Sequence, residues 1–69
     1  MSPKHRRAMR LPATEDKVGL KRDSIYRLAR QGKFPRPVKL SERASGWYED
    51  ELDAWLEQRA AQRDAGVRA

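Results

Sequence analysis

The segment from Gly19 to Gly32 most constrains what this chain can fold into, because two glycines bracket a short run with a helical apolar period. Ile25, Leu28 and Ala29 fall on one stripe of a helix, while most of the other side chains are polar or cationic and point elsewhere. Each glycine stands where a chain can turn sharply or take a positive φ after a helix end. The segment therefore predicts a short helix with one packed face and one exposed, cationic face.

The exposed face of this helix combines cations with a hydroxyl and a phenol, which suits a helix that reads the major groove of DNA. The same composition also fits a solvated surface helix that has no partner. Both interpretations stay open on this segment alone. The candidate reading residues are Lys21, Arg22, Ser24, Tyr26, Arg27 and Arg30.

Length and composition limit the classes of protein that the chain can belong to. Its 69 residues, with a hydrophobic share of 38%, predict one small domain with a thin core, in which Phe34 and Trp47 are expected to be buried. The absence of cysteine excludes a disulfide framework, and one histidine is too few for a structural zinc site, so no cofactor is expected. Without an apolar run long enough for a bilayer or a signal peptide, we expect a cytoplasmic protein with no membrane partner.

The net charge of +6 is spread unevenly along the chain. The first forty residues hold twelve Lys or Arg and three acidic residues, a net +9, whereas residues 41–69 hold four Arg and seven acidic residues, a net −3. A basic half of this size favours a polyanionic partner, although small basic domains also bind proteins. The basic half is the expected nucleic-acid side.

Residues 1–9 contain a cluster of charges without an apolar period, which predicts a flexible basic arm. Such an arm can lie along phosphates or enter a minor groove, and it can equally be a solubilising tail. His5 has no carboxylate or second histidine nearby in the sequence, so we expect no catalytic or metal role for it. The candidate contacts of the arm and its junction are Lys4, Arg6, Arg7 and Arg10.

Residues 11–18 predict a first short helix, because Pro12 suits a first helical turn and Leu11, Thr14 and Val18 share one face. A turn that contains glycine then leads into the central helix. Two short helices joined in this way form a helix-turn-helix arrangement.

After the central helix, Pro35 and Pro37 force the chain to extend, since proline lacks an amide donor and restricts the residue before it. Residues 38–40 and 45–48 are short strand candidates on either side of a turn, which predicts a small β-hairpin. In a winged helix-turn-helix this hairpin is the wing, and Arg43 at its tip lies beside the DNA backbone or minor groove. Taken alone, Arg43 is equally an ordinary exposed turn residue. The candidate contacts of the wing and its flanks are Lys39 and Arg43.

Residues 49–63 predict the last helix, with Leu52, Trp55 and Leu56 on one stripe and three acidic residues in the first turn, where the helix dipole favours anions. The remaining residues, 64–69, are expected to fray into a disordered tail. The predicted organisation is therefore an arm, one domain over residues 10–63 and a tail.

Several segments together, in this order and spacing, resemble the AlpA family of phage-type regulators over roughly residues 10–60. The resemblance implies a mainly α fold with a small β-hairpin, a winged helix-turn-helix similar to MerR-type DNA-binding domains and to phage excisionases. The segments that carry it are Arg10-Leu11-Pro12, Gly19-Leu20, Ser24-Ile25-Tyr26-Arg27-Leu28, Gly32 to Leu40, Arg43-Ala44, Gly46-Trp47 and Glu51 to Leu56.

The resemblance also implies site residues, placing Arg22, Ser24, Tyr26 and Arg27 toward the major groove and Arg43 at the wing tip. The sequence departs from the family pattern at two positions. Where the family commonly has Ser or Thr to cap the reading helix, this chain has Lys21, whose side chain cannot accept the amide hydrogen bond, so the cap is lost unless Asp23 or solvent substitutes for it. Asp23 is also unusual, and it would either pair with a neighbouring cation or discriminate a base by accepting from cytosine.

The leading hypothesis is a sequence-specific double-stranded DNA-binding protein of a prophage or integrative element. It would act as a transcriptional regulator, for example of an integrase gene, or as an excisionase, also called a recombination directionality factor. Because a single reading helix offers few base contacts, self-association on repeated sites is expected, with an integrase or RNA polymerase as further partners.

Three other classes of function compete with this hypothesis. An adaptor would contact an integrase or polymerase through the acidic last helix and bind DNA only weakly and without specificity. RNA binding is disfavoured because Tyr26 and Tyr48 are the only candidates for base stacking. An enzyme has the least support, since the chain offers neither a cysteine nor paired carboxylates in an apolar setting.

Overall fold

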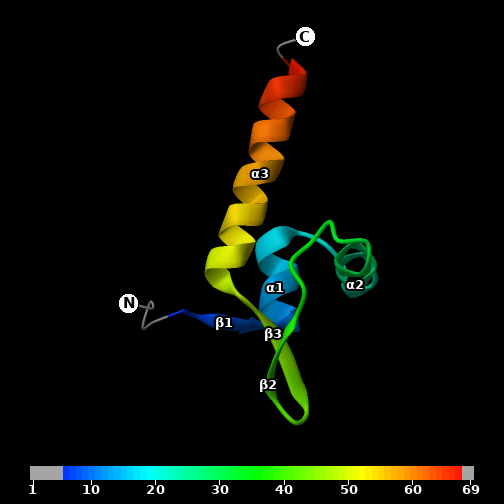
Figure 1. Cartoon of the computed structure of the whole chain (residues 1–69), viewed down its shortest axis with the longest axis vertical. Coiled ribbons are helices and arrows are strands. Elements are labelled where there is room, and N and C mark those ends of the chain that lie inside the picture. The colour runs from blue at the N-terminus through cyan, green and yellow to red at the C-terminus, as the bar shows by residue number, and fades with distance from the viewer. Residues whose placement is uncertain (1–5, 68–69) are drawn as a thin grey trace.

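The computed structural model describes residues 6–67, which form three helices and one three-stranded antiparallel sheet (Figure 1). The sheet has the strand order β1-β3-β2, so the last strand of the sequence lies in the middle. This mixed α/β arrangement is compatible with the winged helix-turn-helix domain that the sequence predicted, and its sheet has one strand more than the predicted hairpin. The elements are β1 (Ala8–Arg10), α1 (Leu11–Val18), α2 (Arg22–Arg30), β2 (Val38–Ser41), β3 (Ala44–Tyr48) and α3 (Glu49–Val67).

Both helices of the helix-turn-helix end in a glycine with positive φ, as the sequence predicted. Gly19 follows α1 with φ 74°, and Gly32 follows α2 with φ 76°. The end of α2 is a Schellman motif, in which the amide of Gly32 donates to the carbonyl of Ala29 at 3.1 Å and that of Lys33 donates to Leu28 at 2.8 Å. These bonds stop the helix and turn the chain into the extended segment that follows.

The core is small, and its buried residues come from all three helices, from β3 and from the loop after α2. Its largest member, Trp47 of β3, is fully buried, and the edge of the Phe34 ring approaches it with 6.2 Å between ring centroids. Thr14 of α1 is also fully buried, and its hydroxyl donates to the carbonyl of Met9 at 3.4 Å. The predicted burial of Phe34 and Trp47 is confirmed. The buried hydrophobic residues are Ile25, Ala29, Phe34, Trp47 and Leu52.

Strand β1 was not expected, because residues 1–9 were predicted to be a flexible arm. It pairs antiparallel with β3, setting Met9 opposite Trp47 and Arg10 opposite Gly46. Gly46 permits this close pairing, since a Cβ atom there would collide with the carbonyl oxygen of Met9. The arm prediction is therefore wrong for Ala8 and Met9, while residues 1–5 lie outside the described part of the chain.

Helix α3 is longer than predicted and continues past Arg63 to Val67. Its last turns project away from the rest of the domain (Figure 1), and residues 61–66 are exposed. The helix therefore includes residues 64–67, which were expected to fray, although the glycine at position 66 has a low helix propensity. No helix within residues 6–67 is both long enough and apolar enough to cross a membrane.

Candidate nucleic-acid interface

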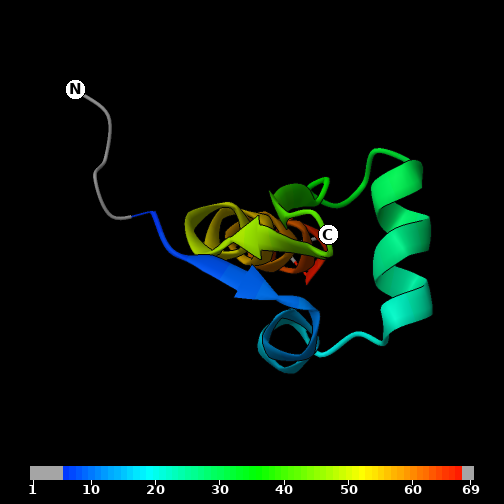
Figure 2. The same cartoon turned by 90° about the horizontal axis from the view of Figure 1, so that it is seen from below.

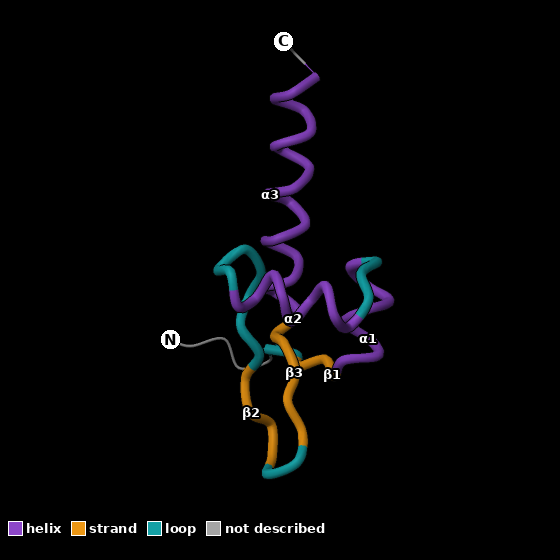
Figure 3. Tube along the Cα trace, turned by 90° about the vertical axis from the view of Figure 1, so that its right-hand side faces the viewer, coloured by secondary structure: helices purple, strands orange, loops and turns teal. Residues whose placement is uncertain are grey.

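Helix α2 is two-faced, as its sequence predicted. Ile25 and Ala29 are buried, whereas Arg22, Arg27 and Arg30 are exposed. Figure 3 shows α2 lying across the domain, between the projecting α3 above and the β2–β3 hairpin below. A cationic helix surface is therefore open to solvent on one side of the molecule.

Two of the predicted reading residues are less exposed than expected. Tyr26 is half-buried, and its ring lies 5.9 Å from that of Trp47 between centroids, at an interplanar angle of 58°. Ser24 is also half-buried. Tyr26 therefore packs against the core with part of its surface, and the expectation that its side chain points wholly away from the core is wrong.

The start of α2 has no side-chain cap, as expected from Lys21. This residue has extended backbone angles and makes no capping hydrogen bond with its side chain, while its carbonyl accepts from the amide of Ile25 at 3.0 Å. Asp23 in the first turn places a carboxylate near the positive end of the helix dipole. Within residues 6–67 this carboxylate forms no ion pair.

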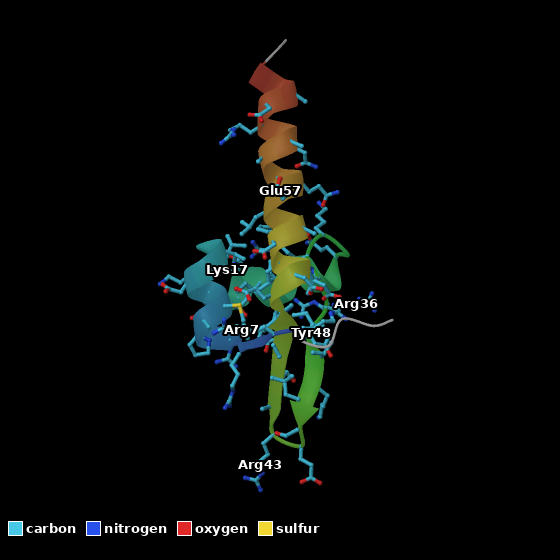
Figure 4. The ribbon with its side chains drawn as sticks, turned by 90° about the vertical axis from the view of Figure 1, so that its left-hand side faces the viewer. Arg7, Lys17, Arg36, Arg43, Tyr48 and Glu57 are labelled. Carbon is cyan, nitrogen blue, oxygen red and sulfur yellow. The ribbon has the colours of Figure 1, made fainter. Side chains whose placement is uncertain are left out.

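The β2–β3 hairpin, called the wing from here on, presents exposed cations beyond the helices. Arg43 lies at the tip of the wing, at the far end of the molecule from Glu57 of α3 (Figure 4). Its amide donates to the hydroxyl of Ser41 at 3.4 Å within the turn, and Lys39 on β2 is exposed as well. The hairpin predicted from the sequence is confirmed, with a register irregularity between Lys39 and Ser41.

Two tryptophan indoles fix the loop between α2 and the wing. The Nε1–H of Trp47 donates to the carbonyl of Pro35 at 2.7 Å, and that of Trp55 donates to the carbonyl of Lys33 at 2.8 Å. Because these bonds hold the loop backbone, the exposed side chains of Lys33 and Arg36 extend from a defined position. Neither cation was among the contacts predicted from the sequence, although both flank the Phe-Pro segment that follows the reading helix.

Arg6, which was expected to contact DNA as part of an arm, is instead bonded to acidic side chains of the same protein. Its guanidinium donates to both carboxylate oxygens of Asp50 at 3.0 and 3.1 Å and to Glu51 at 3.3 Å. It also lies 3.8 Å above the ring of Tyr48. The hydrogen bond from Arg6 lowers the pKa of Asp50 and raises its own. Of the other arm residues, Arg7 and Arg10 are exposed, and Lys4 lies outside the described residues.

Lys17 of α1 forms ion pairs with two further carboxylates at the start of α3. Its Nζ lies 2.9 Å from Asp53 and 3.6 Å from Glu49, and these carboxylates raise the pKa of Lys17, with the Asp53 hydrogen bond as the largest cause. Figure 2 shows β1 leading away on the side of the domain opposite α2. The acidic start of α3 is therefore tied to Arg6 and to α1 and does not mask α2.

The described residues hold no group of three or more His, Cys, Asp or Glu side chains that could bind a metal ion. The two tyrosines weighed for base stacking are both engaged, Tyr26 against Trp47 and Tyr48 beneath Arg6. What residues 6–67 do present is a set of exposed cations on α2, the loop after it and the wing. We call this set the cationic face, and its members are Lys21, Arg22, Arg27, Arg30, Lys33, Arg36, Lys39 and Arg43.

The whole cationic face lies within the part of the chain that matches a known protein family. The family model described as Prophage CP4-57 regulatory protein (AlpA) matches residues 7–60. The DNA-binding transcriptional activator AlpA of Escherichia coli K12 is 37% identical over 59 residues, which cover 77% of this chain and 84% of that protein. The protein ORF88 of Enterobacteria phage P4 is 38% identical over 63 residues, covering 91% of this chain and 72% of the phage protein. No solved structure matches.

Proposed function

Because the chain belongs to the AlpA family of prophage regulatory proteins, we propose that it is a sequence-specific double-stranded DNA-binding protein that regulates transcription. The observation that carries this proposal is the cationic face, in which a two-faced helix lies beside a projecting wing. Cations that meet DNA phosphates release condensed counterions, which supplies affinity for any duplex. Sequence preference requires further contacts to base edges.

In the proposed complex, α2 lies in the major groove and the wing lies against the adjacent backbone or minor groove. Arg27 is exposed on the outward side of α2, and we propose that its guanidinium reaches a base. Arg43 and Lys39 of the wing fix the register through phosphates. We include Arg22, Arg30, Lys21, Ser24 and the exposed part of Tyr26 as groove or flanking contacts.

The proposed contact set differs from the sequence-based one at both ends of the chain. We add Lys33 and Arg36, because their loop joins α2 directly to the wing. We leave out Arg6, because a guanidinium already bonded to two carboxylates would have to give them up before it could bind a phosphate. Arg7 and Arg10 remain proposed backbone contacts.

A single reading helix contacts few base pairs, so we propose that several copies bind side by side on repeated sites. A transcriptional regulator is expected to occupy one or two sites that overlap a promoter. An excisionase is expected to load cooperatively on closely spaced sites and to bend the DNA. An integrase or RNA polymerase remains the proposed protein partner in either role.

The adaptor alternative relies on the acidic start of α3 as a surface for an integrase or polymerase. In that region Asp50 and Glu51 are bonded to Arg6, and Glu49 and Asp53 lie beside Lys17. These carboxylates are already partly neutralised within the chain. The arrangement therefore supports DNA binding through the opposite face over docking through this one.

The test is a footprint on the DNA that flanks the protein's own gene and any neighbouring integrase gene, with random competitor at two salt concentrations. The proposal predicts protected sites that survive competitor near physiological salt, in one or more copies. Loss of all protection at that salt, with no preferred sequence, would reject sequence-specific binding and favour the adaptor.

A further inference from the structure

Asp23 is the single carboxylate on a helix that otherwise exposes cations. It is exposed in the first turn of α2, with Arg27 four residues later and Arg30 seven residues later on the same side of the helix. We propose that Asp23 is a specificity-determining residue, which accepts a hydrogen bond from the exocyclic amino group of a cytosine in the major groove. This inference rests on the proposed function, because it assigns a role within the same DNA-binding face.

The position of Asp23 along α2 supports contact with bases. In helix-turn-helix proteins the N-terminal part of the reading helix approaches the base edges. Asp23 is the second residue of α2 and is exposed, whereas Ser24 and Tyr26 are half-buried. Among the side chains of the first turn, Asp23 therefore combines exposure with a strong hydrogen-bond acceptor.

The carboxylate has no partner within residues 6–67. It makes neither an ion pair nor a side-chain hydrogen bond there, although Arg27 stands one turn away on the same side. Asp50 and Asp53, at the start of α3, are both held by cations from other elements. Of the two roles that the sequence left open for Asp23, pairing with a neighbouring cation is thus not the one adopted in this structure.

The chemistry of the groove determines what an unpartnered carboxylate can recognise. An ionised carboxylate only accepts hydrogen bonds, and cytosine presents an amino donor in the major groove. Guanine and thymine present acceptors at their major-groove edges, and adenine places its N7 acceptor beside its amino donor, so a carboxylate is repelled more by these three bases than by cytosine. Asp23 would therefore both favour cytosine and reject these competitors, and its charge would weaken binding to unrelated duplexes.

The experiment selects bound sequences from a pool of randomised duplexes, using the full chain and the variants Asp23→Ala and Asp23→Asn. We expect the wild-type protein to require cytosine at one position of its site. In Asp23→Ala that preference should fall by about 5- to 150-fold while the other positions keep theirs. In Asp23→Asn the preferred base should change toward adenine, which an asparagine amide recognises through a donor and an acceptor.

Glu57→Gln is the matched control, since it removes one carboxylate from an exposed position of α3 far from the wing tip (Figure 4). It should leave the selected sequence unchanged. Thermal unfolding of each variant without DNA separates recognition from a dipole effect on the start of α2, because a purely structural role would lower the midpoint and leave base preference intact.

The inference is overturned if both Asp23 variants select the wild-type site with the same preference at every position. It is also overturned if preference weakens equally at all positions or is lost at a position other than a cytosine. A wild-type protein that selects no sequence would instead reject the proposed function itself, so the two failures are distinguishable.

Discussion

Two groups of cations within residues 6–67 differ in what stands beside them. On the cationic face, Arg27, Arg30 and Arg43 are exposed and form no ion pair within residues 6–67. In the opposite region, which comprises Arg6, α1 and the start of α3 and is called the paired region below, Arg6 and Lys17 are bonded to carboxylates. Residue type alone therefore does not tell which cation is free for a ligand.

The two regions also depend on each other. Arg6, which precedes β1, and Lys17 of α1 bind the carboxylates at the start of α3 on the side away from α2. Exposed ion pairs contribute little to stability individually. Their main consequence here is the separation of charge that leaves the cationic face uncancelled, and the following predictions are designed to break or sharpen that separation.

The largest effect is expected where β3 of the wing pairs with β1, the strand that leads into α1. Gly46→Ala would drive a Cβ atom into the carbonyl of Met9, which belongs to the backbone of β1 and cannot move aside easily. We expect the free energy of unfolding to fall toward the upper end of the range of about 1–3 kcal/mol that overpacking costs. Urea unfolding followed by circular dichroism measures it.

Gly66→Ala is the control for this prediction, since nothing lies within 4 Å of the position of its Cβ. It should preserve stability or raise it slightly, because alanine favours a helix over glycine. Equal stability of the two alanine variants would mean that the close pairing of β1 with β3 is not required.

The next largest effect is expected on the affinity for DNA, with little change in the stability of the fold. Arg27→Ala should weaken binding to the footprinted site by about 1–3 kcal/mol, as expected for a good polar contact to a base or phosphate. Because Arg27 is exposed, the free energy of unfolding should change by no more than about 0.5 kcal/mol. Fluorescence anisotropy with a labelled duplex, together with urea unfolding, measures both quantities.

Lys17→Ala is the control for Arg27→Ala, because it also removes one positive charge but does so in the paired region. It should lower stability slightly and leave the DNA affinity close to that of the wild type. Similar losses of affinity in the two variants would show that net charge matters and that its placement does not.

A smaller effect is expected at the wing. Arg43→Ala should weaken binding to specific and unrelated duplexes alike, because a phosphate contact carries no base information. The slope of log K against log salt should become shallower by about 1. If Arg43→Ala instead relaxes the preference at one base pair, the wing reads sequence and the division between α2 and the wing must be revised.

The smallest effect is a pH dependence confined to the paired region. Arg6 lowers the pKa of Asp50 in the folded protein. The ion pair therefore stabilises the fold at neutral pH, and this contribution is lost as the pH falls through the lowered pKa of Asp50. In Arg6→Met the loss of stability on acidification should therefore be smaller than in the wild type. Urea midpoints at a series of acidic pH values test this, and identical pH profiles for the two proteins would contradict the pairing.

Local signals in the sequence predicted the helix-turn-helix and the wing. Gly19 and Gly32 fixed the helix ends, and Pro35 and Pro37 marked the change from helix to extended chain. The bounds of α1 were predicted correctly because proline, the apolar spacing and the terminal glycine all lie within one short segment. Features of this kind need no knowledge of distant residues.

The features that the sequence did not predict depend on contacts between distant segments. Strand β1 has three residues and is defined only by its pairing with β3, and Arg6 meets Asp50 across 44 positions of the chain. The partial burial of Tyr26 likewise depends on where Trp47 of β3 lies. These long-range contacts are what divide the cations into the cationic face and the paired region.

The most direct measurement of this division is a titration of the isotope-labelled protein with a footprinted duplex, followed by nuclear magnetic resonance. The backbone amides of α2 and the wing and the guanidinium signals of Arg27 and Arg43 should shift strongly. The signals of Arg6, Lys17 and the first turns of α3 should stay nearly unchanged. Strong shifts confined to Arg6, Lys17 and α3, with α2 unaffected, would contradict the assignment of the cationic face to DNA.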